Sequence, residues 1–261
     1  MQEVDVRCDL SVLLPTYNER ENLPVVLYLL YNELNKMADL EFEVIVVDDN
    51  SPDGTGDVAR TLSELFPSLR VIGRDRKRGL GSAYRHGLKF CMGALVMIMD
   101  VDLSHHPRDA PKLLRRQRET QCDIVAGNRY GDPSGVEGGI TGWDMRRKIT
   151  SRGAHMLILP FSPPFTDPTG SFRVYKREVL SKLCKVTQSD GFCFQVESAI
   201  LAGRLGYKTD EVPITFVNRV LGESKLGLGE YQRYVSLLWS MVWRGRGDKA
   251  KTLRKRETKR Q

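Results

Sequence analysis

The chain has 261 residues, of which 41% are hydrophobic and 28% are charged, and its formal net charge is +7. This composition is typical of a globular protein and excludes collagen-like and wholly disordered chains. The whole basic excess lies in residues 244–261, which hold nine Lys or Arg and two Asp or Glu, so residues 1–243 carry 31 basic and 31 acidic side chains. Because a nucleic-acid binder usually carries its basic stripe on the folded body, this pattern argues against nucleic acid as a partner.

The cysteines and the apolar runs limit the cellular compartment in which the protein is expected. The five cysteines are odd in number and widely spaced, without a CxxC pair, which indicates reduced thiols rather than a disulfide framework or zinc site. The charged start of the chain has no secretory pattern, and no apolar run approaches the ~20 residues that span a bilayer. We therefore expect a protein that faces the cytosol and is soluble or bound at a membrane surface.

The first half of the chain alternates two kinds of segment. Short apolar runs predict strands over 11–15, 42–48, 70–74, 94–99 and 123–126, and amphipathic stretches predict helices over 21–34, 56–66, 78–92 and 107–119. This alternation predicts an α/β fold with a mostly parallel central sheet flanked by helices. Right-handed crossovers would place all the carboxyl ends of the strands at one edge, where ligands of such sheets bind.

The second half is less regular. A Gly-rich stretch over 131–142 is interpreted as a mobile loop, helices are expected over 143–159, 193–204 and 229–243, and strands over 172–175 and 212–217. No internal repeat or linker divides the chain. We expect one domain over 10–229, an N-terminal extension over 1–9, and an amphipathic helix with a basic tail over 230–261.

Polar residues gather just after the predicted strands, and the sharpest pattern is Asp100-Val-Asp102. Residues i and i+2 of an extended chain face the same side, so both carboxylates can bind one cation. Hard oxygen ligands suit Mg²⁺ or Mn²⁺ held jointly with a phosphate-bearing substrate. An acidic turn in solvent is the alternative, but the position after a buried strand and beside a second acidic strand end favours the cation site.

The second acidic strand end is Asp48-Asp-Asn-Ser-Pro-Asp53. Paired acids often only stabilise turns, and Asp53 precedes a glycine, which is good turn chemistry. We assign Asp48, Asn50 and Asp53 mostly to turn formation and Asp49 to ligand binding.

Two further patterns leave alternatives open. Gly79-Leu-Gly81 could cradle a phosphate, but it lacks the full spacing of either known phosphate-binding fingerprint, so a helix start with tight backbone packing is favoured. His105-His106 lies beside Asp102, yet its spacing does not support zinc, and a helix cap or a substrate contact is favoured.

Several motifs, in the same order along the chain, resemble those of the dolichyl-phosphate β-mannosyltransferase family. The members of this family are inverting family 2 glycosyltransferases of GT-A fold. They are Leu14-Pro-Thr-Tyr-Asn-Glu19, Val47-Asp-Asp-Asn-Ser-Pro-Asp-Gly-Thr55, Gly79-Leu-Gly-Ser-Ala-Tyr84, Met99-Asp-Val-Asp-Leu-Ser-His-His-Pro107, Gly127-Asn-Arg-Tyr130, Gly142-Trp143, Ile149-Thr-Ser-Arg-Gly153, Asp167-Pro-Thr-Gly-Ser-Phe172 and Arg219-Val-Leu-Gly-Glu-Ser-Lys225. The resemblance covers about residues 10–230. Each motif is weak alone, but the set is specific.

The resemblance implies a reaction and its setting. Mannose would pass from GDP-mannose to dolichyl phosphate with inversion, aided by Mg²⁺ or Mn²⁺, giving dolichyl β-D-mannosyl phosphate for N-glycan, GPI-anchor and O- and C-mannosylation pathways. The chain is similar to the single-domain form that works on the cytosolic face of the endoplasmic reticulum with small membrane-spanning subunits. Rival interpretations are a dolichyl-phosphate glucosyltransferase using UDP-glucose and a non-catalytic nucleotide-sugar-binding subunit.

The resemblance also assigns roles to single residues. Those expected to hold the guanosine are Pro15, Tyr17, Glu19, Val47 and Asp49, and those at the nucleotide and metal site are Asp100, Val101 through its backbone, and Asp102. Arg219 and Lys225 would close over the diphosphate and, with Asp102 and Arg129, form the catalytic set, Arg129 also contacting the donor.

Acceptor and membrane contacts are assigned more loosely. Arg129, Arg147 and Ser151 would bind the acceptor phosphate, since Arg147 and Ser151 share a face of the expected helix; Arg147 could instead belong to a basic surface run. Possible sugar contacts are Asp167, Gln195 and Glu197, which could also be turn residues. The aromatic and basic 230–261 segment is expected to anchor the protein to a membrane or dock a membrane subunit, with packing on the body as the alternative.

Overall fold

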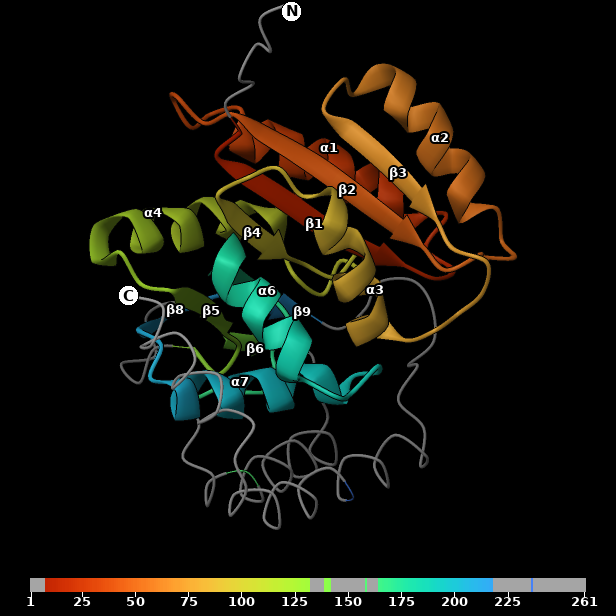
Figure 1. Cartoon of the computed structure of the whole chain (residues 1–261). Helices are drawn as coiled ribbons and strands as arrows, with labels where there is room; N and C mark the ends of the chain where they lie inside the picture. Colours follow the sequence, from red (N-terminus) through yellow and green to blue (C-terminus); the bar gives the residue numbers. More distant parts are fainter. Residues whose placement is uncertain (1–7, 132–138, 142–157, 159–163, 218–235, 237–261) are drawn as a thin grey trace, which may run out of the picture.

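The structure is a computed structural model that describes residues 8–131, 139–141, 158, 164–217 and 236. Seven strands form one sheet in the order β3-β2-β1-β4-β7-β5-β8 (Figure 1). Their bounds are β1 Leu10–Thr16, β2 Phe42–Asp48, β3 Leu69–Gly73, β4 Leu95–Ile98, β5 Ile124–Asn128, β7 Arg173–Lys176 and β8 Thr209–Pro213. A separate pair joins β6 (Gly139–Thr141) to β9 (Thr215–Val217).

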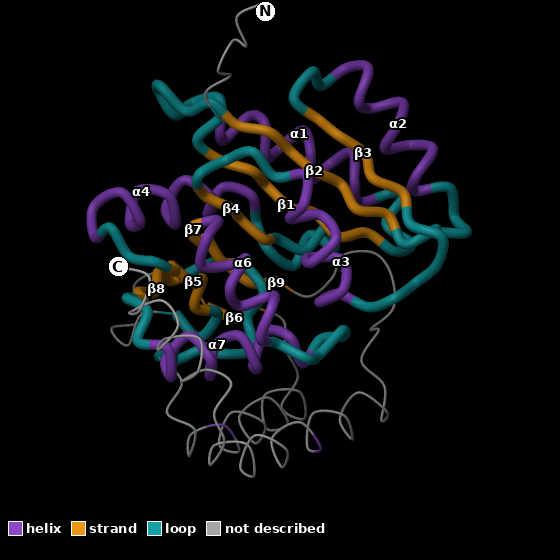
Figure 2. Tube along the Cα trace, in the orientation of Figure 1, coloured by secondary structure: helices purple, strands orange, loops and turns teal. Residues whose placement is uncertain are grey.

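Helices cover both faces of the sheet, as the alternation of segments predicted (Figure 2). Their bounds are α1 Asn22–Leu34, α2 Thr55–Leu65, α3 Leu80–Gly87, α4 Ala110–Thr120, α6 Arg177–Val186 and α7 Cys193–Leu205, with short 3-10 turns η1 Leu88–Phe90 and η2 Pro107–Asp109. One hydrophobic cluster joins the sheet to α3, α6 and α7, and the other joins it to α1, α2 and α4. The predicted three-layer α/β fold is confirmed.

The expectation that every strand's carboxyl end meets at one edge is wrong for β7. This strand is antiparallel to both of its neighbours, β4 and β5, whereas β3, β2, β1 and β4 are parallel, as are β5 and β8. The chain leaves β5 at the carboxyl edge and enters β7 from that same edge. The residues just before β7 therefore lie among the strand ends that carry the polar motifs.

Several element boundaries differ from the predictions for local reasons. The helix expected over 78–92 ends at Gly87, where a Cβ would lie 2.3 Å from Leu13 Cδ1, so glycine lets α3 lie close against β1. The expected 212–217 strand is instead the end of β8 and β9, which belong to different sheets. Helix α6 was not predicted, although Val179, Leu180 and Leu183 recur at helical spacing and are buried.

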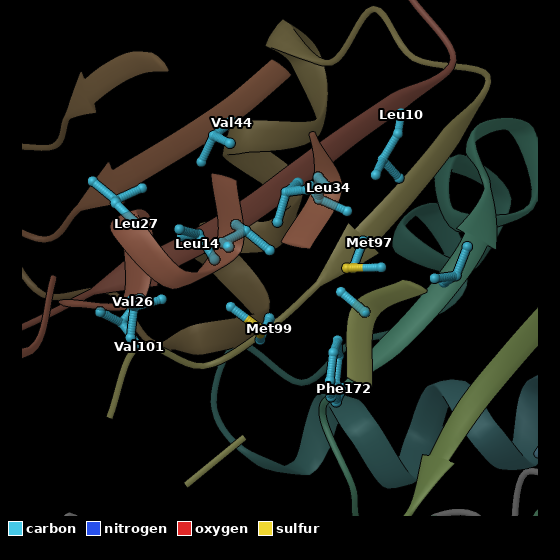
Figure 3. Close-up of a cluster of buried hydrophobic side chains, with 14 of the residues drawn as sticks. Leu10, Leu14, Val26, Leu27, Leu34, Val44, Met97, Met99, Val101 and Phe172 are labelled. Carbon is cyan, nitrogen blue, oxygen red and sulfur yellow. The ribbon is translucent and has the colours of Figure 1, made fainter. Parts of the chain in front are cut away.

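Val101 connects the core to the strand ends. It belongs to the hydrophobic cluster on the α1 side of the sheet, together with Val26, Met99 and Phe172 (Figure 3). Its side chain is 2% exposed, although the residue follows the end of β4. The core therefore holds the segment between the two predicted carboxylate ligands in place.

Some expectations fall on parts of the chain that lie outside the described residues. These are most of the 131–142 loop, nearly all of the helices expected over 143–159 and 229–243, the N-terminal extension up to residue 7 and the basic tail. Of the helices that the structure does describe, none has the length and apolar character needed to cross a bilayer.

Candidate active site

A cavity of about 420 Å³ opens at the carboxyl ends of β1, β2 and β4. Its walls come from these strand ends, from the loop between β3 and α3, and from the residues just before α7. The residues predicted to bind the donor that line it are Pro15, Tyr17, Glu19, Asp49, Asp100, Val101 and Asp102. The structure thus brings together nearly all of the described residues assigned to the nucleotide.

The two aspartates after β4 are held by hydroxyl groups on either side. Ser171 Oγ donates to Asp100 Oδ2 at 2.7 Å. The backbone N–H and Oγ of Ser104 donate to Asp102 Oδ1 at 3.1 and 2.5 Å. Ser171 reaches Asp100 because β7 runs antiparallel beside β4, so that the residues just before β7 lie beside those just after β4.

A divalent cation fits these residues. No group of three or more His, Cys, Asp or Glu side chains within the described ranges could hold a metal alone. Mg²⁺ and Mn²⁺ do not need such a cage, because they bind one or two carboxylates and take further oxygen ligands from substrate phosphates. Asp100 and Asp102, both in the cavity wall, supply the oxygen donors of such a site.

His105 packs beside the loop that carries the two aspartates. Its ring is buried between those of Phe172 and Phe216, with centroids 5.3 and 5.4 Å away. Burial lowers the pKa of the imidazole, which favours the neutral ring, and Nδ1 accepts a long 3.4 Å hydrogen bond from Asp100 N–H. His106 has the predicted capping role, since its Nδ1 accepts from Arg108 N–H at 3.2 Å.

Asp49 lines the cavity and also fixes the loop after β3. Arg74 Nε donates to Asp49 Oδ1 at 2.5 Å, and Arg78 N–H donates to Oδ2 at 3.2 Å. The Arg74 and Asp49 side chains are only 4% and 8% exposed, so water screens this ion pair weakly. Arg74 was not singled out from the sequence, where it is the last residue of the third predicted strand and starts a basic stretch.

The neighbouring acids have the turn roles predicted for them. Asp48 accepts hydrogen bonds from Ser51 N–H and Oγ at 3.0 and 2.6 Å. Asp53 accepts from Thr55 N–H and Oγ1 at 3.0 and 2.6 Å, just before α2 begins. These bonds hold the turn that presents Asp49.

The glycines before α3 serve close packing. At Gly79, whose φ is +93°, a Cβ would lie 2.4 Å from the Asp190 carbonyl oxygen. At Gly81 it would lie 2.6 Å from the Ser189 carbonyl oxygen and 2.9 Å from Phe194 Cβ. The interpretation favoured from the sequence, a helix start with tight backbone packing, accounts for both positions.

Val47 is placed differently from the other residues assigned to the guanosine. Its side chain is fully buried in the cluster beneath α3 and is not among the residues that line the cavity. The structure therefore gives this side chain a core role and no contact with the nucleotide cavity.

Arg129 and Asp167 form a buried ion pair that the sequence did not predict. Arg129 Nε and Nη2 donate to the two carboxylate oxygens of Asp167 at 2.6 and 2.7 Å. Burial alone would raise the pKa of Asp167, but the charge and hydrogen bonds of Arg129 lower it to about 2. Neither residue lines the cavity. Asp167, expected to contact the sugar, instead orients an arginine.

The other two residues expected to contact the sugar are also bonded inside the protein. Gln195 Nε2 donates to Tyr84 Oη at 2.9 Å. Glu197 accepts from the N–H groups of Gln188 and Ser189, at distances of 2.8 to 3.0 Å. Both side chains are nearly fully buried and neither lines the cavity. These contacts hold both side chains inside the protein, and their contact with the sugar stays a prediction.

Four residues assigned from the resemblance lie outside the described residues. They are Arg147 and Ser151, expected to bind the acceptor phosphate, and Arg219 and Lys225, expected to close over the diphosphate. Their roles stay predictions.

The family follows from a comparison with known proteins. Residues 11–184 match the model of "Glycosyl transferase family 2". The chain belongs to this family. Among solved structures, this family 2 chain is similar to the mannosyltransferase PcManGT from Pyrobaculum calidifontis in complex with GDP-Man and Mn²⁺, with a TM-score of 0.61 and 22% identity over 94% of this chain and 68% of that one. The likeness confirms the predicted GT-A fold.

Curated relatives of the family 2 chain act on polyprenol lipids according to their names. A dolichol-phosphate mannosyltransferase of Pyrococcus furiosus is 37% identical over 92% of this chain, which spans 65% of that longer protein. An undecaprenyl-phosphate mannosyltransferase of Micrococcus luteus is 40% identical over 83% of this chain and 87% of its own length. A polyprenol monophosphomannose synthase of Mycolicibacterium smegmatis is 36% identical over 92% of this chain and 89% of its own length.

Proposed function

We propose that this family 2 glycosyltransferase transfers mannose from GDP-mannose to dolichyl phosphate and inverts the anomeric carbon. The observation that carries the proposal is the joint placement of Asp100, Asp102 and Asp49 in one cavity of a chain whose relatives are polyprenol-phosphate mannosyltransferases. The products are dolichyl β-D-mannosyl phosphate and GDP. The same relatives make the UDP-glucose alternative less favourable.

The proposed reaction requires the protein mainly to position the two substrates and to stabilise the negative charge of the leaving group. The acceptor is a phosphate that is already anionic at neutral pH, so its attack on the anomeric carbon hardly needs a general base. Catalysis then depends on aligning the two substrates and stabilising the leaving diphosphate. A cation bound by Asp100 and Asp102 would supply positive charge for that diphosphate. Ser171 and Ser104 keep the two carboxylates in position through their hydrogen bonds.

The roles of Arg129, Arg147 and Ser151 toward the acceptor phosphate, and of Arg219 and Lys225 toward the diphosphate, are part of this proposal. A guanidinium with a nearby hydroxyl is suited to clamp a phosphate. Of these residues the structure describes only Arg129. Its Nε and Nη2 donate hydrogen bonds to Asp167, and its positive charge also interacts with the carboxylate of Asp100.

A transfer assay tests the function. The full chain in detergent receives labelled GDP-mannose or UDP-glucose, a dolichyl phosphate, and Mg²⁺ or Mn²⁺. We expect metal-dependent mannosyl lipid from the parent and from the control Asp57→Asn, an exposed residue of α2, and loss of product from Asp102→Asn. Glucosyl lipid would overturn the donor. No product with either sugar, even in the presence of membranes that supply accessory subunits, would favour a non-catalytic binding subunit.

The proposal extends to location and partners. The protein would act on the cytosolic face of the endoplasmic reticulum beside small membrane-spanning subunits, and its product would feed N-glycan, GPI-anchor and O- and C-mannosylation pathways. The basic excess of residues 244–261 supports a membrane contact, since each Lys or Arg near an anionic surface contributes roughly 1 kcal/mol. A chain truncated after Gly229 should leave the membrane fraction of cells, and its retention there would contradict the anchor.

A further inference from the structure

Lys77 belongs to the loop between β3 and α3 and lies in the wall of the same cavity as the aspartate pair. Its Nζ is 4.1 Å from the centroid of the Tyr17 ring, and both side chains line the cavity. Within the described part of the chain, the Lys77 ammonium makes no hydrogen bond or ion pair. None of its donors is taken up by these described residues.

The sheet order separates the end of β3, from which the Lys77 loop starts, from the end of β4. The loop that carries Lys77 follows β3, and Asp100 and Asp102 follow β4, with β2 and β1 between them (Figure 1). Neighbouring strands lie about 4.8 Å apart, so these strand ends are separated by roughly 14 Å. A nucleoside diphosphate laid across these strand ends, with its phosphates beside the aspartates, would extend its base towards the side of the cavity that the loop after β3 lines.

The loop around Lys77 is held firmly on both sides. Asp49 accepts hydrogen bonds from Arg74 Nε and from Arg78 N–H, three residues before and one residue after Lys77. Gly79 then packs against the backbone of Asp190. The Tyr17 ring attracts the ammonium itself through a cation–π contact. A donor group in a fixed place can distinguish between bases because little ordering is left to occur on binding.

Guanine is the base that this placement suits. Its O6 and N7 are adjacent acceptors on one edge, which a lysine or arginine binds preferentially, and a pyrimidine has no matching pair. We propose that Lys77 selects a guanine nucleotide by donating from Nζ to O6 and N7 of the base. The proposal deepens the proposed function, because it rests on a GDP-linked donor, and it assigns that specificity to a residue outside the motifs of the sequence analysis.

Nucleotide binding to the full chain, measured by calorimetry with Mg²⁺ present, tests the proposal with GDP, UDP and 7-deaza-GDP, which lacks N7. In the parent, GDP should bind more tightly than the other two. Lys77→Ala should weaken GDP binding about tenfold, the effect of losing one paired base contact, leave UDP binding unchanged, and abolish the difference between GDP and 7-deaza-GDP. Lys77 is exposed, so its truncation should not disturb folding.

Arg76→Ala is the matched control, since Arg76 is an exposed cation of the same loop outside the cavity wall. It should leave all three affinities unchanged, which separates a base contact from a general effect of charge. If Lys77→Ala retains the parent's preference for GDP, the role of Lys77 is overturned while the donor stands. If the parent itself prefers UDP, the donor in the proposed function is overturned as well.

Discussion

Asp167 binds Arg129 with both carboxylate oxygens, and a second acid holds Asp167 in turn. The backbone N–H of Asp167 donates to Glu211 Oε1 at 3.0 Å, and Arg129 Nη2 also donates to Thr169 Oγ1 at 2.5 Å. Arg129 is thus fixed on one side by a buried network that joins β5, the approach to β7, and β8. Its guanidinium also lies over the Phe216 ring, with Cζ 5.2 Å from the centroid.

This pair predicts a dependence of stability on pH. The pKa of Asp167 in the folded protein is lowered to about 2, from an ordinary value near 3.8. A group with a lowered pKa stabilises the fold above its unfolded pKa, and the contribution is lost as pH falls from about 4 towards 2. Asp167→Asn should therefore be less stable by about 2 kcal/mol at pH 7 and flatten the acid limb of the curve. Chemical denaturation at several pH values measures this.

The control for Asp167 is Asp57→Asn, which removes an exposed carboxylate of α2. Its ion pair with Arg60 is exposed to water and contributes little, so this variant should stay close to the parent curve and change far less than Asp167→Asn. An Asp167→Asn curve parallel to that of the parent between pH 4 and 2 would contradict the ion-pair interpretation.

Ser171 should act on the reaction through Asp100. Removing its hydroxyl leaves Asp100 Oδ2 without the 2.7 Å bond that orients it. Groups that orient metal ligands contribute on the order of tenfold or more to metal affinity, so Ser171→Ala should raise the half-saturating concentration of Mg²⁺ or Mn²⁺ by roughly that factor. Activity measured against metal concentration tests this, and excess metal should largely restore the rate. Ser63→Ala, at a partly exposed residue of α2 whose hydroxyl bonds only to the Arg60 carbonyl among the contacts of the described residues, should behave as the parent.

Glu43 should affect folding without affecting the reaction. It lies near the start of β2, away from the cavity, and its Oε1 accepts from Ser11 Oγ and Met92 N–H, each at 2.6 Å. Glu43→Ala removes the acceptor of the buried Ser11 hydroxyl and of the Met92 N–H, and leaving a buried donor unpaired costs about 1–3 kcal/mol. The midpoint of urea unfolding should fall accordingly, while activity per folded molecule stays constant. Glu41→Ala, two residues earlier and exposed, should not shift the midpoint.

Gly81 should not tolerate a methyl group. A Cβ there meets the Ser189 carbonyl oxygen at 2.6 Å and Phe194 Cβ at 2.9 Å, so Gly81→Ala must displace α3 or the segment before α7. Such overpacking destabilises by about 1–3 kcal/mol. Thermal unfolding measures it, with Gly73→Ala as the control, because a Cβ at that glycine meets nothing within 4 Å. Equal melting temperatures for the two variants would sink the packing argument.

Local patterns sufficed for the first half of the fold. The apolar run at 42–48 became β2 without change, because continuous burial on both faces of a parallel sheet leaves an unambiguous signal. The Asp100-Val-Asp102 pattern was equally readable, since its neighbours along the chain are enough to place it. Direction was not readable for β7, because nothing within a strand of four residues records which neighbours it pairs with.

The contacts in the site that the sequence did not reveal join distant segments of the chain. Ser171 and Asp100 are 71 positions apart, and Arg129 and Asp167 are 38 apart. A lone serine or arginine in a loop carries no mark of such a partner. The role proposed for Lys77 could not be predicted from the sequence for a similar reason. It depends on contact with Tyr17, which follows a different strand.

The antiparallel β7 links ligand binding to the completion of the sheet. Strands β3, β2, β1 and β4 come from residues 10–98, whereas Ser171, which holds Asp100, arrives only when β7 docks against β4. The aspartate pair therefore lies where the strands from residues 10–98 meet the strands that follow them in the chain. A metal–nucleotide ligand that contacts both halves binds only the state in which β7 is paired with β4. Ligand binding therefore raises the population of that folded state by mass action. Binding of the nucleotide sugar should therefore stabilise the contact between β4 and β7 beside which it is bound.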